Sequence, residues 1–139
     1  MAATFQFQLV TPTGVVFDGP VEQVSATGPL GQFGVLADHV NFITSLVPAV
    51  MTVRTGDGQT LEYLVTGGLV EVKDGAMTAL APSAESPEKA EPADESELRA
   101  AEQRLAQLSM YDPGYIEAEQ AVAVMRARHD VAQSRRHAH

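Results

Sequence analysis

The residue types that carry most enzyme chemistry are sparse in this chain. It has no cysteine, which excludes a thiolate nucleophile and a cysteine-based zinc site. The pair Asp38–His39 lies in a turn-rich stretch, and such a pair can orient a general base. However, neighbours in sequence rarely face each other, and no Gly-x-Ser-x-Gly segment supplies a nucleophile. We therefore expect a non-catalytic protein.

Metal and phosphate sites are not indicated either. His137 and His139 would hold a metal only loosely, because no His-x-x-x-His or His-Glu-x-x-His motif supports them. The glycines of residues 31–34 and 67–68 do not form phosphate loops, since no Gly-Lys-Ser/Thr follows them and no Gly-x-Gly-x-x-Gly leads into a helix. These glycines are expected to serve turn geometry or close strand packing. We expect no cofactor and no metal.

Charge and hydropathy restrict the partners. The 139 residues include nine Lys or Arg against 18 Asp or Glu, a formal net charge of -9. This excess of acid repels phosphate backbones, so a nucleic-acid partner is not expected. Hydrophobic residues make up 45%, enough for a core, but no run approaches the roughly 20 apolar residues of a membrane-spanning helix. We expect no direct membrane insertion.

The elements that must position any site differ between the two halves of the chain. Ten of the eleven glycines precede Pro82, and residues 5–9 alternate apolar with polar side chains, which is typical of a half-buried strand. Glycine-containing turns at 56–58 and 73–75 separate further apolar runs and predict two hairpins. Several short strands at this spacing predict an antiparallel β-sandwich or barrel over residues 1–82.

The second half is predicted to be helical. Residues 83–97 contain six acids, one lysine and two prolines, which predicts a solvated, extended linker. Asp94 fits the cap of a first helix, and Asp112 and Pro113 fit the start of a second. Apolar residues recur at helical spacing on both sides of the break at 112–114. They predict an antiparallel two-helix hairpin over residues 98–139, with the stripe Leu98, Ala101, Leu105, Leu108 and then Ala118, Val122, Met125, His129, Ala132.

The far end of this acidic chain is locally basic. Residues 98–139 carry six basic and five acidic groups, and four of the basic ones are Arg126, Arg128, Arg135 and Arg136. A basic end can serve solubility alone, but it also suits contact with an acidic protein surface.

Five segments resemble the epsilon subunit of bacterial F-type ATP synthases. They are residues 9–12, 15–19, 31–39, 46–48 and 65–72, which follow in that family's order and spacing. The resemblance covers residues 4 to about 82. It implies an N-terminal β-sandwich of two stacked sheets followed by a C-terminal two-helix hairpin.

The resemblance also implies a place in the central stalk of the rotary motor. There the sandwich binds the gamma subunit and rests on the ring of c subunits. In many members the hairpin can swing toward the alpha and beta subunits and inhibit ATP hydrolysis. The implied function is to couple proton-driven rotation to ATP synthesis, at the cytoplasmic face of the inner (plasma) membrane, as a peripheral protein.

The family's ring-facing loop corresponds here to residues 31–41. The resemblance therefore implies ring contacts from Gly31, Gln32, Phe33, His39 and Asn41. Gln32 stands where the family has an acid, so a charge-assisted hydrogen bond would become a weaker neutral one. His39 matches the family histidine, which is either a turn residue bonded to a backbone carbonyl or a direct ring contact.

Many members carry an ATP-binding motif, Ile/Leu-Asp-x-x-Arg-Ala, at the start of the hairpin. Arg99 matches the arginine of this motif, but Glu95 occupies the aliphatic position and Ser96 replaces the aspartate. A carboxylate beside a bound phosphate is repulsive. We therefore predict no tight ATP binding.

Two alternatives stay open from the residues alone. The first is a free-standing β-sandwich that binds a small ligand, with the helices as a lid. The second is an enzyme that uses Asp38–His39 and still lacks a nucleophile. Co-migration with large ATPase subunits would support the rotor subunit over both.

Overall fold

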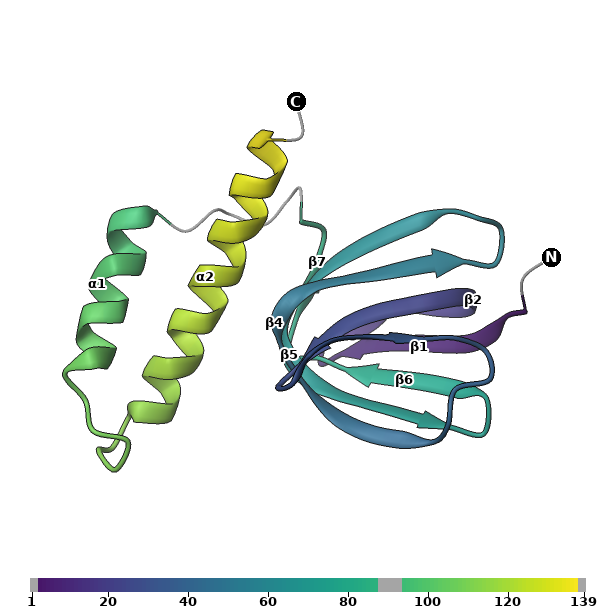
Figure 1. Cartoon of the computed structure of the whole chain (residues 1–139), viewed down its shortest axis with the longest axis horizontal. Coiled ribbons are helices and arrows are strands. Elements are labelled where there is room, and N and C mark those ends of the chain that lie inside the picture. The colour runs from purple at the N-terminus through teal and green to yellow at the C-terminus, as the bar shows by residue number, and fades with distance from the viewer. Residues whose placement is uncertain (1–2, 88–93, 138–139) are drawn as a thin grey trace. The chain divides into compact units, whose positions relative to one another are not determined.

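The computed structural model describes residues 3–87 and 94–137. It divides the chain into two compact units, residues 1–87 and 88–139. The first unit consists of strands and the second of two helices (Figure 1). This agrees with the predicted change from strands to helices along the chain.

The strand unit is one continuous sheet that closes on itself. Its strand order is β1-β6-β5-β4-β2-β3, and β1 also pairs with β2. The predicted β-sandwich is confirmed, but β1 pairs with β6 in parallel, whereas every other pairing among the described strands is antiparallel. No short turn joins β1 to β6, so nothing requires them to be antiparallel. The strands are β1 (Phe5–Thr11), β2 (Gly14–Gly28), β3 (Gly31–Val35), β4 (Phe42–Thr55), β5 (Thr60–Lys73), β6 (Ala76–Leu80) and β7 (Ala84–Glu85).

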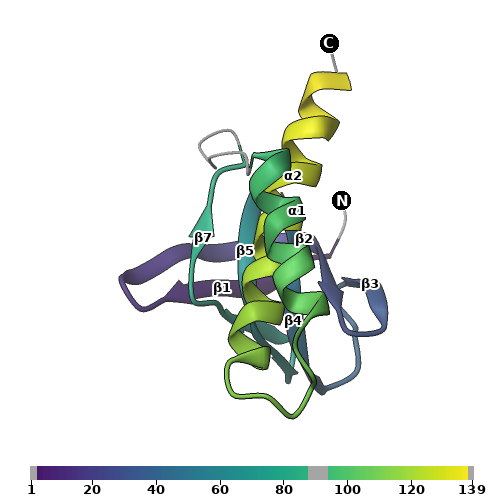
Figure 2. The same cartoon turned by 90° about the vertical axis from the view of Figure 1, so that its left-hand side faces the viewer.

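The core of this unit follows the predicted alternation. Phe5, Phe7 and Leu9 are buried on β1, while the residues between them are more exposed. Phe7 and Leu9 pack with valines and methionines from β2, β4, β5 and β6. Burial of this apolar surface is the main term that stabilises the closed sheet. In Figure 2, β3 and β7 lie on opposite sides of this unit.

Both predicted hairpin turns are present. Asp74 and Gly75, with φ of 52° and 80°, form the turn between β5 and β6. Positive φ at both central residues is the geometry whose twist matches paired antiparallel strands. In the turn between β4 and β5, Gly58 has φ of 89°, and the Thr55 hydroxyl donates to the Asp57 carboxylate.

The predicted linker over 83–97 is too long at both ends. Ala84 and Glu85 form β7, which pairs with Val65 and Leu64 of β5. At the other end, α1 (Glu95–Ala106) begins inside the predicted linker. The Asp94 side chain accepts a hydrogen bond from the Ser96 backbone N–H at 3.1 Å, so the capping residue fixes this start. Residues 88–93 lie outside the described residues.

The helical unit pairs α1 with α2 (Tyr115–His137). Leu98, Ala101 and Val122 are buried together, with Leu105 and Met125 packed against them, as the stripe predicted. Leu108, also predicted on the stripe, lies beyond the end of α1.

Candidate functional site: an apolar sheet face and the 31–41 segment

One face of the sheet carries a row of exposed apolar side chains. The register pairs Leu69 with Leu80, Leu80 with Val10, and Val10 with Val15, while the polar Ser45 of β4 lies opposite Leu69. Directly opposed residues project on the same side of a sheet, so the apolar side chains cross β5, β6, β1 and β2. Leu69, Leu80 and Val15 are 45%, 49% and 57% exposed. These three residues and the half-buried Val10 are called the apolar row below.

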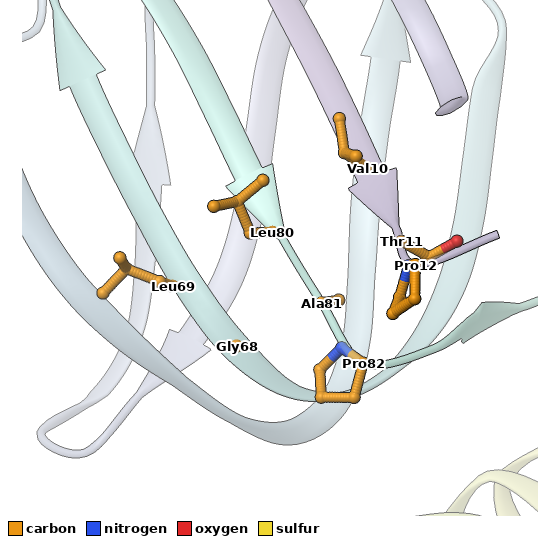
Figure 3. Close-up of a pocket in the computed structure, with 8 residues that line it drawn as sticks. All are labelled: Val10, Thr11, Pro12, Gly68, Leu69, Leu80, Ala81 and Pro82. Atoms are coloured by element: carbon orange, nitrogen blue, oxygen red, sulfur yellow. The ribbon is translucent and has the colours of Figure 1, made fainter. Parts of the chain in front are cut away.

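The apolar row borders an open depression with a volume of about 540 Å³ (Figure 3). Its lining is almost entirely apolar and contains no charged side chain. The one polar side chain is Thr11, whose hydroxyl bonds to that of Thr13 at 3.0 Å. The lining residues are Val10, Thr11, Pro12, Gly68, Leu69, Leu80, Ala81 and Pro82. Such a surface can exclude water against a partner, but it offers no group for acid–base or nucleophilic chemistry.

Gly68 lines the depression at the point where β5 approaches the end of β6. It has φ of 125°, and a Cβ placed on it would overlap the carbonyl oxygen of Leu80. Only glycine therefore allows β5 to approach the end of β6 this closely. The expected role of the 67–68 glycines in close strand packing is confirmed at this position.

The apolar row could not be predicted from the sequence. Its members are single residues on four strands, so they meet only once the register is known. One local signal was present: Ala76, Thr78 and Leu80 share the outer side of β6, and Leu80 is a large apolar residue at an exposed position.

The residues of the predicted ring-facing loop fall into two groups. Gly31 and Gln32 are exposed beside the turn between β2 and β3, where Leu30 is fully exposed. His39 and Asn41 follow the other end of β3, in the 36–41 loop before β4. The structure therefore places the two groups at opposite ends of β3, and a partner must span the strand to contact both.

Phe33 and His39 support the 36–41 loop. The Phe33 and Phe42 rings pack edge to face with centroids 5.7 Å apart, and the His39 ring lies 4.9 Å from Phe42. The His39 backbone N–H donates to the Leu36 carbonyl at 3.1 Å. His39 Nδ1 lies 2.9 Å from the Val40 carbonyl oxygen, to which a protonated Nδ1 donates. This is the geometry of a turn histidine bonded to a backbone carbonyl.

Asp38 and His39 do not form a catalytic pair in the part of the chain described. Asp38 is exposed, and the Nδ1 of His39 is engaged by Val40 instead. Residues 3–87 and 94–137 contain no group of three or more His, Asp or Glu side chains placed to hold a metal ion. Among those residues, no helix combines the length and the apolar character needed to cross a membrane.

The groups with shifted pKa values lie outside the apolar depression. Burial raises the pKa of Tyr63, and the hydrogen bond from the Thr55 hydroxyl lowers the pKa of Asp57. A hydrogen bond with Glu119 raises the pKa of Tyr115. These shifts have local structural causes and none of these groups lines the depression.

The predicted basic side chains of α2 have different surroundings. Arg126 Nη2 donates to Glu102 Oε1 at 2.9 Å, which links α2 to α1. Arg128 is half-buried. The side chains of Arg135, Arg136 and His137, and the whole of His139, lie outside the described residues. Contact of these arginines with an acidic partner stays a prediction.

The residues at the positions of the broken ATP motif form hydrogen bonds with one another and with the helix cap. Arg99 Nη2 donates to Glu95 Oε1 at 3.1 Å, so the retained arginine pairs with the carboxylate at the aliphatic position. The Ser96 N–H is engaged by Asp94. The absence of tight ATP binding stays a prediction.

Comparison with known proteins places the strand unit in a family. Residues 4–87 match the family described as "ATP synthase, Delta/Epsilon chain, beta-sandwich domain". The ATP synthase epsilon chains of Bradyrhizobium sp. (strain ORS 278) and Afipia carboxidovorans are each 45% identical over 84 residues. That alignment spans 60% of this chain but only 62% and 61% of those relatives.

Solved structures share the fold over most of the chain. A chain from the Euglena gracilis mitochondrial ATP synthase, in a structure of OSCP, F1 and c-ring, has a TM-score of 0.72 at 23% identity. It covers 95% of this chain and 83% of its own. A chain from the Tetrahymena thermophila mitochondrial ATP synthase central stalk and c-ring has a TM-score of 0.63 at 16% identity, covering 93% and 96%. From the match over residues 4–87, this chain belongs to the family of ATP synthase delta and epsilon chains.

Proposed function

We propose that this protein is the epsilon subunit of an F-type ATP synthase, a non-catalytic subunit of the central stalk that couples proton-driven rotation to ATP synthesis. The apolar row on a closed sheet is the observation that carries the proposal, in a chain whose relatives are epsilon chains. The structures that share its fold come from ATP synthase stalk and ring assemblies. In this role the protein is peripheral, at the cytoplasmic face of the plasma membrane, held there by its partners.

The apolar row is the proposed contact with the gamma subunit. Transmission of torque requires an interface that does not slip, and stable interfaces have a well-packed, apolar, desolvated centre. Leu69 and Leu80 provide such a centre, and Ile43 adds a further exposed apolar side chain on the same face of β4 as Ser45. Closure of the sheet through β1 holds these strands in fixed relation, because every strand of the row is paired with its neighbours.

The two ends of β3 are the proposed contacts with the ring of c subunits. Gln32 lies at one end, and the 36–41 loop lies at the other. Leu36 and Val40 are 58% and 74% exposed in this loop, so apolar contact supplements the hydrogen bonds that Gln32 offers.

The helical hairpin is the proposed regulatory element, which contacts the alpha and beta subunits and inhibits ATP hydrolysis. Its own core contains only Leu98, Ala101 and Val122 among the described buried residues. A change between two arrangements from 1:99 to 99:1 requires about 5.5 kcal/mol, so the resting arrangement must be only modestly favoured.

A small-ligand site is a weaker explanation of the depression. Ligand sites combine an enclosed apolar pocket with a few polar groups that fix orientation. The depression here is open, and its single polar side chain is already bonded to Thr13.

The proposal is tested with the double variant Leu69→Gln/Leu80→Gln in the full chain. Both side chains are about half exposed, so the variant should fold with a nearly unchanged melting temperature. Its binding to the gamma subunit should weaken at least about tenfold, since buried interface leucines each contribute on the order of 1 kcal/mol or more. Calorimetric titration with purified gamma subunit measures this.

Ile116→Gln is the control, because it removes an exposed apolar side chain, 71% exposed, from α2. Its binding should equal that of the unchanged protein. Undiminished gamma binding by the double variant would show that the apolar row is not the docking surface.

A further inference from the structure

The end of the 36–41 loop is joined to a distant turn by a pair of side-chain bonds. Asn41 Oδ1 accepts from the backbone N–H of Asp74 at 3.0 Å. Asn41 Nδ2 donates to Asp74 Oδ1 at 3.5 Å. The two residues are 33 positions apart and meet because β4 and β5 pair immediately beside them, with Phe42 opposite Val72.

The turn between β5 and β6 leaves the backbone N–H of Asp74 without a partner in the hairpin, and Asn41 accepts from it. Asp74 is the one non-glycine residue with positive φ in the described part of the chain, and Lys73 pairs with Ala76 across the turn. The first central residue of such a two-residue turn has a backbone N–H outside the ladder of the hairpin. By accepting from this N–H, Asn41 supplies the missing partner of a strong donor.

The 36–41 loop is thus held at several points while the side chains of Leu36 and Val40 stay exposed. The His39 N–H bonds to Leu36, and the His39 ring packs on Phe42. Asn41 then fixes the last residue before β4 to the turn between β5 and β6. The polar atoms of Asn41 are used within the protein, whereas Val40 beside it projects into solvent.

We propose that Asn41 and Asp74 are a positioning pair: they fix the 36–41 loop to the turn between β5 and β6 so that Leu36 and Val40 meet the ring of c subunits in one geometry. This inference rests on the proposed function, which supplies the ring as partner. It changes the role expected for Asn41 from a direct ring contact to a residue that acts through its neighbours.

A charge exchange between the two positions tests the pair. Asn41→Asp keeps an acceptor for the Asp74 N–H but loses the amide donor and places two carboxylates together. Asp74→Asn keeps an oxygen acceptor and a side chain that tolerates positive φ. The double variant Asn41→Asp/Asp74→Asn again matches an acceptor at position 41 with an amide donor at position 74, so it should restore both bonds.

Two measurements on the full chain separate positioning from stability. Hydrogen exchange at the backbone amide of residue 74 and at the loop amides reports whether the loop is anchored. Binding of the chain, together with purified gamma subunit, to the purified c ring in detergent reports its function. Asn41→Asp should raise the exchange rate and weaken ring binding, each about fivefold to tenfold, as expected from the loss of a hydrogen bond. The double variant should return the exchange rate and the ring affinity to within about twofold of the unchanged protein. The control is Asp57→Asn, in the turn between β4 and β5, which should leave ring binding unchanged.

Each contrary outcome has a distinct meaning. If Asn41→Asp accelerates exchange but binds the ring as the unchanged protein does, the positioning role is wrong and the proposed function stands. If the double variant restores slow exchange but not ring binding, Asn41 contacts the ring itself and the inference is overturned. If the unchanged protein and gamma subunit do not bind the ring at all, the proposed function fails and this inference fails with it.

Discussion

The two units of this chain differ sharply in how much apolar surface holds each together. Among the residues that the structure describes, the core cluster of the strand unit contains sixteen buried residues, whereas that of the helical unit contains three. Full burial of a large aliphatic or aromatic side chain contributes about 1.5–3 kcal/mol. The strand unit can therefore keep one geometry under load, while the helical unit is held by few contacts and can be rearranged at low cost. The proposed function thus places rigid coupling in the unit with the large core and regulation in the unit with the small one.

The largest effect expected from this comparison is at Gly68 in the strand unit. Gly68→Ala should reduce the free energy of unfolding by at least about 3 kcal/mol, because the added Cβ meets the backbone of Leu80, which cannot move aside as a flexible side chain can. Urea denaturation measures the loss.

Gly75→Ala is the control for the Gly68 variant. Gly75 also has positive φ, but a Cβ there meets no atom within 4 Å, so only the backbone cost of about 1–2 kcal/mol applies. If the two variants lost the same free energy of unfolding, the close approach of β5 and β6 would not be the reason that residue 68 must be glycine.

A smaller effect is expected from the core of the helical unit. Val122→Ala removes two buried methyl equivalents and should cost about 1–2 kcal/mol. Because the cluster is so small, this loss should reduce helical circular dichroism at 37 °C while the unfolding transition of the strand unit keeps its midpoint. Gln120→Ala, at an exposed position of α2, is the control and should leave the helical signal intact. A shift of the strand transition instead would mean that the two cores do not behave independently.

The smallest effect concerns the pH dependence of the strand unit. The Thr55 hydroxyl lowers the pKa of Asp57 below its value in the unfolded chain, about 3.9. Between the two pKa values the unfolded chain binds more protons, so stability rises with pH through this window. The contribution is present above about pH 4 and is lost as pH falls through the lowered folded pKa.

Asp57→Asn should therefore show a slightly smaller difference in urea midpoint between pH 7 and pH 2.5 than the unchanged protein. Asp38→Asn, at another exposed acid, is the comparison variant. An equal pH dependence in the Asp57 variant and the unchanged protein would contradict the role given to the Thr55 hydroxyl.

The sequence predicted well the features that are determined by adjacent residues. Alternation at residues 5–9, glycines at the two hairpin turns and the cap at Asp94 each depend on a few neighbouring side chains, and the structure has them. The resemblance over residues 4 to about 82 was confirmed by the family match over residues 4–87. The predicted start of the second helix was wrong, although Asp112 and Pro113 are residues that often begin a helix.

In the structure, Asp112 accepts instead from the Ser109 N–H at 2.8 Å, and Gly114 has φ of 86°, which delays α2 until Tyr115. The apolar row and the Asn41–Asp74 bonds could not be predicted either. Both depend on the register of strands far apart in the chain, and a shift of one residue would turn each side chain to the other face.

The parallel pairing of β1 with β6 has a consequence for biosynthesis. Residues 6–10 are paired with residues 76–80, so some seventy further residues must be translated after β1 before its edge next to β6 is covered. Until then, the nascent chain offers an unpaired edge that other chains can join. Contacts between segments this distant also slow folding. A chaperone that shields residues 5–11 during translation should therefore raise the yield of this protein more than that of its helical segment produced alone.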